Sequence, residues 1–195
     1  MFFKSDLSKA QQGFTLIELL VVIAIAGILG TLAAPSVFQF ARRSAMQSVS
    51  NDFTGGIQRA RTEAVSGNIC ATICKSATTN TASPTCTPGA SGIYASDDWH
   101  MGWIVFRNPT CDRSITTANP SSPGDIIIVR QPGDPRYTMV TTDSLRFMTF
   151  GPQGSMGSAG RFTMQDSQNS TQALNRSICV NILGRVRIIA DGASC

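Results

Sequence analysis

The sequence is poor in the residues from which metal sites are built. It contains a single histidine, His100, and its six cysteines include no Cys-x-x-Cys pair, the closest spacing being Cys70-x-x-x-Cys74. A structural zinc site needs four clustered ligands, almost always Cys or His. The composition therefore argues against a metal site, and no cofactor is expected.

Two short segments suggest catalysis but lack the residues that would complete a motif. His100 follows Asp97 and Asp98, which is compatible with acid–base chemistry, yet a turn with a structural histidine before a Trp-containing strand is the better interpretation. The glycine-rich run at 150–160 lacks the Lys-Ser/Thr pair and the helix of a phosphate loop, so it predicts a hairpin connection. We therefore expect no enzymatic activity.

Lysine and glutamate are also scarce. Arginine supplies 13 of the 16 basic residues, and Glu18 and Glu63 are the only glutamates, in a chain of net charge +4. Arginine suits bidentate contacts with carboxylates or phosphates, although a compositional bias of the genome is an equally good explanation. Removal of residues 1–13 would take away two lysines and one aspartate and leave +3, a mild excess.

One apolar run stands out near the start of the chain. From Phe14 to Ala34 its only polar side chains are Thr15, Glu18 and Thr31, and about 20 such residues suffice for a helix to span a bilayer. The preceding residues, 1–13, carry two lysines. The positive-inside rule therefore predicts a single-pass membrane protein with residues 1–13 in the cytoplasm and the C-terminal part across the membrane.

Two features distinguish this run from a secretory signal peptide. A signal peptide is cleaved after its apolar segment, whereas the candidate processing point here, Gly13-Phe14, lies before it. In addition, Glu18 places a carboxylate within the run, which costs about 2.5 to 3.5 kcal/mol at the centre of a membrane helix and less near its end. Such a group marks a function or a buried partner, the alternative being an interfacial residue that reaches water.

The string from Gly13 to Leu20, GFTLIELL, resembles the processing site of type IV pilins and type II secretion pseudopilins. In that family a prepilin peptidase cleaves after the glycine and methylates the new N-terminal phenylalanine. The glutamate neutralises the N-terminal amine of a neighbouring subunit during assembly. The resemblance implies that residues 1–13 are a cleaved leader, that Phe14 is the mature N-terminus, and that Glu18 is the assembly carboxylate.

A helical pattern continues beyond the apolar run but becomes amphipathic. Apolar residues recur every three or four positions up to Ala64, which is typical of a helix that lays one stripe on a globular domain. The helix should end near Gly67. The sequence thus predicts a membrane and assembly half, residues 14–34, followed by an amphipathic half, residues 35–67.

Glycine and proline weaken this helix at two places. Gly27, Gly30 and Pro35 predict a kink or a locally meltable segment between residues 27 and 35. Gly55-Gly56 is a second soft point, because each glycine costs about 1 kcal/mol relative to alanine in a helix.

Residues 68–195 change to the period of β-strands. Strand candidates are 69–75, 102–107, 126–130, 136–141, 145–150, 160–165, 177–183 and 185–190. Their connections are too short for crossover helices, so the sheets must be antiparallel. With the amphipathic helix covering one face, the predicted fold class is α+β, a long N-terminal helix on an antiparallel β-sheet domain.

The even number of cysteines on the exported side predicts disulfides. Fifteen pairings are possible in principle. Pairing Cys74 with Cys86 closes a small Ser/Thr/Pro-rich loop, and pairing Cys179 with Cys195 fastens the C-terminal tail. Cys70 and Cys111 then remain as the third pair.

The order of several short motifs narrows the resemblance to minor pilins of the GspH/FimT family, which include FimU-like proteins. The motifs are the leader, Ala60-Arg61-Thr62-Glu63-Ala64, Ile73-Cys74-Lys75, Gly102-Trp103-Ile104-Val105-Phe106, Phe150-Gly151-Pro152-Gln153-Gly154 and Gly184-Arg185-Val186-Arg187. That family implies a type IV pilin-like fold and a low-abundance subunit at the tip of a pilus or pseudopilus. The Cys-flanked loop before Trp99 and the insert at 108–124 depart from the pattern, so the outward surface cannot be transferred.

Arg185 and Arg187 form the candidate contact surface. Residues two apart on a strand point to the same face, about 6.6 Å apart, so both guanidiniums should face outward while Val186 and Ile188 turn inward. FimT-like competence pilins use a Gly-Arg-x-Arg tail in DNA binding, which makes Gly184, Arg185 and Arg187 candidates for a DNA contact. The alternatives are solvated arginines or a contact with a neighbouring pilin.

Three functions follow from the resemblance. The favoured one is a structural minor pilin that primes assembly and supports adhesion, twitching or DNA uptake at the cell surface. The others are a DNA-binding competence pilin and a minor pseudopilin of a type II secretion system. The implied partners are the prepilin peptidase, other minor and major pilins, the inner-membrane assembly platform and, for the second function, DNA.

Overall fold

The structure is a computed structural model that describes residues 14–87, 98–114, 118–141, 145–168 and 175–195, without the side chains of residues 32–35. The predicted leader 1–13, which includes Gly13, and Asp97 lie outside these residues. By its internal contacts the chain divides into two units, Met1–Arg42 and Arg43–Cys195.

The predicted helix is present as α1, Leu16–Gly67, a continuous element that runs from the first unit into the second. No single helix in the described part of the chain meets the length and hydropathy expected of a membrane span, whereas the consecutive stretches 16–31 and 36–67 meet them together as a bent pair. Pro35 lies in the break between these stretches. The role of Gly27, Gly30 and Pro35 in bending or melting the helix stays a prediction.

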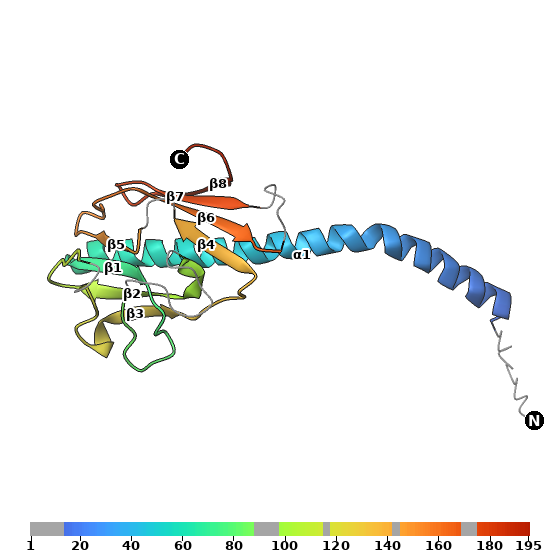
Figure 1. Cartoon of the computed structure of the whole chain (residues 1–195), viewed down its shortest axis with the longest axis horizontal. Helices are drawn as coiled ribbons and strands as arrows, with labels where there is room; N and C mark the ends of the chain where they lie inside the picture. The colour runs from blue at the N-terminus through green and yellow to red at the C-terminus, as the bar shows by residue number, and fades with distance from the viewer. Residues whose placement is uncertain (1–13, 88–97, 115–117, 142–144, 169–174) are drawn as a thin grey trace, which may run out of the picture. The chain divides into compact units, whose positions relative to one another are not determined.

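The second unit contains two four-stranded antiparallel sheets (Figure 1). In the first sheet the strand order is β3-β2-β1-β5, with β1 at Cys70–Lys75, β2 at Trp103–Asn108, β3 at Ile126–Arg130 and β5 at Phe147–Phe150. In the second sheet it is β4-β6-β7-β8, with β4 at Tyr137–Thr141, β6 at Gly160–Asp166, β7 at Arg176–Val180 and β8 at Val186–Ala190. Two 3-10 helices, η1 at Trp99–Met101 and η2 at Pro123–Asp125, precede β2 and β3. The predicted α+β class and antiparallel sheets are confirmed.

One predicted strand is shorter than expected. The segment 177–183 was expected to be a single strand, but β7 ends at Val180 and residues 181–184 form the turn to β8. The Asn181 side-chain oxygen accepts hydrogen bonds from the backbone N–H groups of Leu183 (3.1 Å) and Arg185 (2.9 Å). Gly184 closes the turn with a φ of +72°. Local side-chain hydrogen bonding of asparagine therefore overrides the β-propensity of Ile182 and Leu183.

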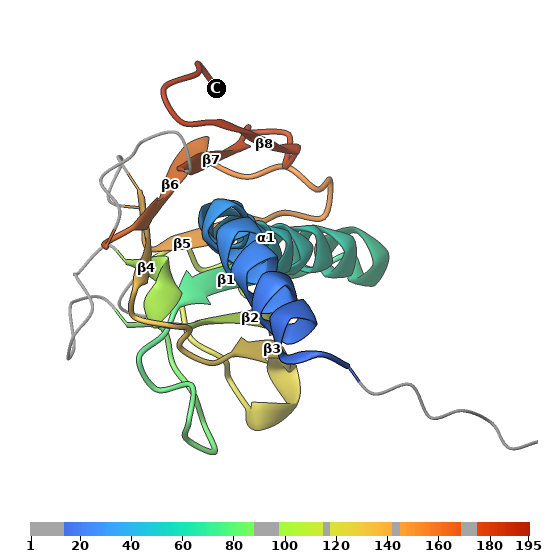
Figure 2. The ribbon, with the colours of Figure 1, turned by 90° about the vertical axis from the view of Figure 1, so that its right-hand side faces the viewer.

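The buried face of α1 is the centre of the second unit. This face runs from Ala45 to Ala64. Phe38 and Ala41, which continue the same apolar spacing toward the N-terminus, are exposed. Figure 2 shows β6 to β8 on one side of the helix and β1 to β3 on the other. Phe53, which is fully buried, contacts Trp103 of the first sheet and Phe162 of the second, with ring centroids 6.0 and 4.8 Å away.

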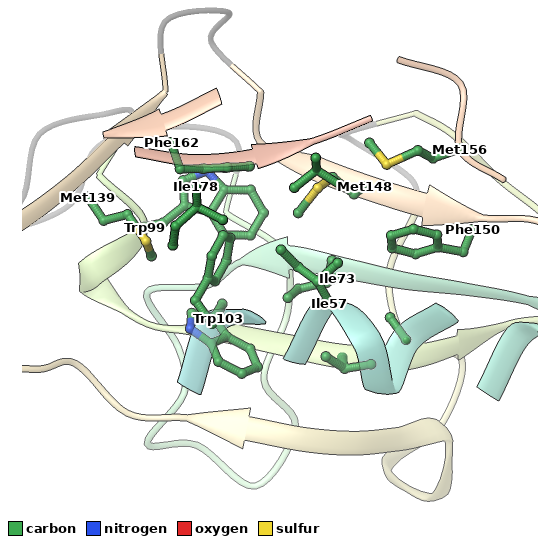
Figure 3. Close-up of a cluster of buried hydrophobic side chains, with 14 of the residues drawn as sticks. Ile57, Ile73, Trp99, Trp103, Met139, Met148, Phe150, Met156, Phe162 and Ile178 are labelled. Atoms are coloured by element: carbon green, nitrogen blue, oxygen red, sulfur yellow. The ribbon is translucent and has the colours of Figure 1, made fainter. Parts of the chain in front are cut away.

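Apolar side chains from the helix and both sheets complete this core (Figure 3). They include Ile57, Ile73, Met148, Phe150, Met139 and Ile178. Trp99 of η1 joins them, and its ring nitrogen donates to the Leu145 carbonyl at 2.8 Å. The two sheets therefore share a single core through the helix.

Three disulfides fasten the periphery of the second unit. They join Cys70 to Cys111, Cys74 to Cys86 and Cys179 to Cys195. These are the three pairs favoured from the sequence, and no cysteine is left as a free thiol. The first two bonds hold the loops beside β1, and the third holds the C-terminal tail against β7.

Arg61, near the C-terminal end of α1, joins two glycine turns to the helix. Its Nε donates to the Gly154 carbonyl at 3.1 Å. A Cβ at Gly184 would lie 2.8 Å from that same carbonyl and 2.8 Å from Arg61 Cδ, and a Cβ at Gly154 would lie 3.0 Å from Arg61 Nε. The segments around Arg61, Gly154 and Gly184, which are far apart in the sequence, thus meet at one point. The close packing against the Arg61 side chain requires glycine at both 154 and 184.

Glu63 makes a second connection from the helix, to the first sheet. The side chain is only 12% exposed, and its carboxylate accepts a 2.6 Å contact from Arg107 of β2 and a 3.5 Å contact from Arg59 one turn earlier. The Ala-Arg-Thr-Glu-Ala segment therefore contacts one sheet through its glutamate and the turn before the last strand through its arginine. This explains why both charged types occur in it.

A pair of substitutions in α1 tests the close contact with Trp103. Alanine at a helical glycine normally stabilises a protein by about 0.5–1 kcal/mol, and Gly55→Ala should do so because nothing lies within 4 Å of the new Cβ. Gly56→Ala would place its Cβ 2.4 Å from Trp103 Cη2 and should destabilise the domain by about 1–3 kcal/mol through overpacking. Urea unfolding of residues 43–195 measures both, and equal stabilisation by the two changes would contradict the packing described.

A second pair tests the Arg61 junction. Gly184 and Gly192 both have positive φ, +72° and +82°, so alanine at either position carries the left-handed penalty of about 1–2 kcal/mol. Only Gly184 has neighbours that a Cβ would strike. Gly184→Ala should therefore lower the free energy of unfolding by at least about 1 kcal/mol more than Gly192→Ala. Identical losses in urea titrations would contradict the close packing of Gly184 against Arg61.

Candidate functional site

The start of α1 contains the first candidate site. Thr15 and Glu18 form a capping box: the Thr15 N–H and hydroxyl both donate to Glu18 Oε2 at 3.1 Å, and the Glu18 N–H donates to the Thr15 hydroxyl at 3.3 Å. This arrangement satisfies backbone donors that a helix start leaves unpaired. The helix therefore begins two residues after Phe14, the predicted mature N-terminus.

The Glu18 carboxylate keeps one oxygen available. Both bonds from Thr15 go to Oε2, and Oε1 has no hydrogen-bond partner among the described residues. The side chain is exposed, and Phe14 beside it is 91% exposed. An ionised carboxylate can accept several hydrogen bonds, so Glu18 can cap its own helix and still receive a cationic donor from another molecule.

The apolar residues that follow Glu18 are exposed to an unusual extent. Between Leu16 and Leu29 ten large aliphatic side chains are at least 49% exposed: Leu16, Ile17, Leu19, Leu20, Val21, Val22, Ile23, Ile25, Ile28 and Leu29. Exposed apolar surface of this extent marks contact with lipid or with another protein. A carboxylate surrounded by such surface is strongly favoured to pair with a positive group, because an unpaired charge is costly in an apolar environment.

A second candidate site lies on the outer face of the second sheet. A hollow of about 470 Å³ is lined by the side chains of Arg161, Arg185 and Arg187, by Asn181, and by the Cys179–Cys195 disulfide. We call it the arginine hollow. Arg161 of β6, Cys179 of β7 and Arg187 of β8 are register partners, so they form one row across the sheet.

The predicted orientation of the last strand fits this geometry. Arg185 and Arg187 are exposed and line the same hollow, while Val186 and Ile188 pack against the core. Gly184 is buried and serves the turn that presents Arg185, rather than presenting a surface of its own. The first arginine of the pair precedes β8, which begins at Val186.

Sequence reasoning missed Arg161. Its Nε donates to the Cys195 sulfur at 3.1 Å and its Nη2 donates to the Ala193 carbonyl, so it holds the C-terminal tail beside the hollow. Alternation along β6 was a usable signal, because Arg161 precedes the inward-facing Phe162. The sequence did not reveal which strands are neighbours, and only that knowledge places Arg161 in line with Arg187.

The histidine segment is buried. Asp98 Oδ1 accepts hydrogen bonds from the backbone N–H groups of His100 and Met139, both at 2.8 Å, and so fixes η1 to β4. Burial lowers the pKa of His100, against the opposing effect of the Asp98 charge. Burial also raises the pKa of Asp98, against the backbone hydrogen bonds from Met139 and His100.

The surroundings of His100 favour a structural role. The cavity beside its ring holds only about 10 Å³, room for at most one water molecule. A Cβ at Gly133 would lie 2.1 Å from His100 Nε2, so the loop before β4 closes over the ring. Within the described residues no group of three or more His, Cys, Asp or Glu side chains is placed to hold a metal ion.

Comparison with known proteins finds relatives for the N-terminal part of the chain. Residues 8–34 match the family model described as the prokaryotic N-terminal methylation motif. The chain is 46% identical over 57 residues to the fimbrial protein EcpC of Eikenella corrodens and 46% identical over 48 residues to the type IV major alpha-pilin of Moraxella bovis. These matches span 29% and 25% of the chain, and only 37% and 30% of the two relatives.

The remainder of the chain has a different set of matches. Two crystal structures of the type IV minor pilin FimU of Pseudomonas aeruginosa share its fold, with TM-scores of 0.50 and 0.52 at 14% and 16% identity. They cover 73% and 77% of this chain and 91% and 92% of FimU. The family model described as type II transport protein GspH matches residues 49–184. The chain therefore belongs to the GspH family of minor pilins and pseudopilins.

Proposed function

We propose that the chain is a minor pilin, a structural subunit that enters a type IV pilus at or near its tip and primes assembly. The observation that carries the proposal is the Glu18 carboxylate at the start of an exposed apolar helix, whose Oε1 has no partner among the described residues, in a chain that belongs to the GspH family. The proposal assigns a structural and not a catalytic role. Adhesion, twitching and DNA uptake are functions that such a fibre supports.

Assembly follows from charge neutralisation. Cleavage after Gly13 by a prepilin peptidase would leave an amine on Phe14, and the apolar helix would stay in the inner membrane with the second unit in the periplasm. When the helix leaves lipid for the fibre, Glu18 Oε1 accepts a hydrogen bond from the N-terminal amine of a neighbouring pilin. Pairing removes much of the cost of two unpaired charges in an apolar environment, so a correct longitudinal register is favoured over a slipped one.

A pseudopilus is the nearest alternative. The match to the GspH family, described as type II transport proteins, supports it, whereas the likeness to the fold of FimU supports the pilus. Both fibres require the same processing and the same Glu18 contact. Exoprotein secretion would fail on deletion of a pseudopilin, and surface fibres would be lost on deletion of a minor pilin.

DNA binding through the arginine hollow is a further candidate, supported by its charge. Arg161, Arg185 and Arg187 place three guanidiniums around one concavity, and guanidinium groups bind phosphates well. Binding of this type would be independent of DNA sequence and would weaken steeply with salt. The small net charge predicts weak binding by a single subunit.

Substitutions on either side of Phe14 separate processing from assembly. Gly13→Leu should block the peptidase and leave a chain that migrates with its leader on an immunoblot. Glu18→Ala should be cleaved normally but should fall at least about tenfold in sheared fibres, because the amine of its neighbour loses its partner. Thr15→Ala is the matched control, since it removes the capping hydroxyl and keeps the carboxylate.

Uncleaved Glu18→Ala protein, or normal incorporation of it, would contradict the assigned role of the carboxylate. Normal cleavage of Gly13→Leu would move the processing point elsewhere. Poor incorporation of Thr15→Ala to the same degree as Glu18→Ala would show that helix capping, and not charge pairing, is the important interaction.

A further inference from the structure

The outer edge of β8 is open. In the second sheet β8 pairs only with β7, and among the described residues the only other backbone bond to the strand is the turn bond from Ala193 N to the Ala190 carbonyl. Proteins usually protect such edges with proline, lysine, a bulge or a covering segment. The strand, Val-Arg-Ile-Ile-Ala, has no proline or lysine and has high β-propensity, and Arg187 is its one charged residue.

The other sheet edges differ from β8. Asp98 and η1 cover β4, through the bond from Met139 N to Asp98 Oδ1 and the bridge to Val140. Met156 forms a bridge with Phe150 of β5. The pairing of β2 with β3 is irregular between Val105 and Phe106, a feature that disfavours regular strand addition. Among the described residues β8 is therefore the edge most suited to accept another strand.

The two faces of β8 differ in chemistry. On the outer face Arg185 and Arg187 are exposed and line the arginine hollow with Arg161. On the inner face Val186 and Ile188 lie against the core but are only partly buried. A strand added to this edge would place its alternate side chains beside these two sets.

We propose that the β8 edge binds an extended acidic segment of another protein of the fibre, which adds as a fifth strand to the sheet β4-β6-β7-β8. The segment would carry Asp or Glu at two positions two residues apart, opposite Arg185 and Arg187, and apolar residues at the alternating positions, opposite Val186 and Ile188. The charges of Arg185 and Arg187 select an acidic partner, and the backbone N–H and C=O groups on the open edge of β8 bind it by strand pairing. The inference rests on the proposed function only in that the partner is another subunit.

The shape of the hollow favours a peptide over a nucleic acid. Besides the arginines the hollow is lined by uncharged groups, Ala159, Gly160, Asn181 and the disulfide. The next row across the sheet is Thr163, Ser177 and Ile189 and has no charge. The positive surface is thus confined to one concavity, whereas tight binding to a duplex uses about six to ten phosphate contacts.

A peptide-binding measurement tests the proposal on the mature full chain in detergent micelles. The probe is a fluorescent ten-residue peptide that alternates valine and glutamate, and the control probe alternates valine and lysine. Fluorescence anisotropy should show saturable binding of the first probe alone. Hydrogen exchange read by mass spectrometry should slow for residues 186–190, because an added strand protects alternate amides of the edge.

Variants assign the binding to the arginines. The double change Arg185→Gln and Arg187→Gln should weaken binding by about tenfold, as expected for two cross-strand charge pairs. Arg113→Gln, an exposed arginine outside the hollow, should bind as the wild type does. Equal affinity for the two probes, unchanged affinity in the double variant, or protection at another strand would overturn the proposal.

A labelled DNA duplex gives the competing outcome. Salt-sensitive binding of the duplex without binding of the valine–glutamate peptide would assign the hollow to DNA and overturn the peptide proposal. The assay needs no fibre, so its failure would leave the role of the chain as a pilin intact. Conversely, loss of the wild-type chain from fibres with peptide binding retained would contradict the proposed function and not the docking edge.

Discussion

Burial of one face of α1 is the constraint on which the second unit depends. The two sheets are separate hydrogen-bonded systems, and Phe53, Ile57 and Ala60 of the helix lie fully buried between them. Burial of a large apolar side chain such as Phe or Ile contributes about 1.5 to 3 kcal/mol, so this stripe supplies much of what joins the sheets. Arg61 and Glu63 add directional contacts, to the turns at Gly154 and Gly184 and to β2.

This arrangement also determines which surfaces remain for partners. Because the inner faces of both sheets are used by the helix, and a second buried cluster that includes Cys74, Ile104 and Phe106 lies on the other side of the first sheet, the surfaces left for partners include the outer face of the second sheet and the sheet edges. The arginine hollow and the β8 edge are of these two kinds. The same helix that forms the core also begins with Glu18 and an exposed apolar stretch, so in the proposed function one element serves folding at its end and assembly at its start.

Local patterns in the sequence were sufficient to predict most of the elements. The spacing of apolar residues predicted where α1 ends, and alternation bounded by turn residues predicted the eight strands. Both patterns arise from residues that are close in the sequence. The small loop between Cys74 and Cys86 and the C-terminal position of Cys195 favoured two of the disulfides, and the third pair remained by elimination. The failure at residues 181–184 is local as well: the side chain of Asn181 competes with a strand, and the aliphatic residues after it concealed this.

Contacts between distant segments were not predictable from one sequence. Gly56 reads as a soft point in a helix, and its closeness to Trp103 appears only in the packed structure. Gly184 reads as part of a contact motif, although its neighbours are Arg61 and Gly154. Arg161 joins the hollow only because β6, β7 and β8 are adjacent. The packing of the helix decides the first two contacts and the order of strands decides the third, and neither is written in the local pattern.

The most direct test of the account is mass spectrometry of the chain recovered from sheared surface fibres. The account predicts an N-terminal peptide that begins at Phe14, carries one methyl group on its amine and includes Glu18. Fibres that contain the chain with residues 1–13 attached, or fibres that lack the chain while the membrane retains it, would contradict the claim that this helix is an assembly helix.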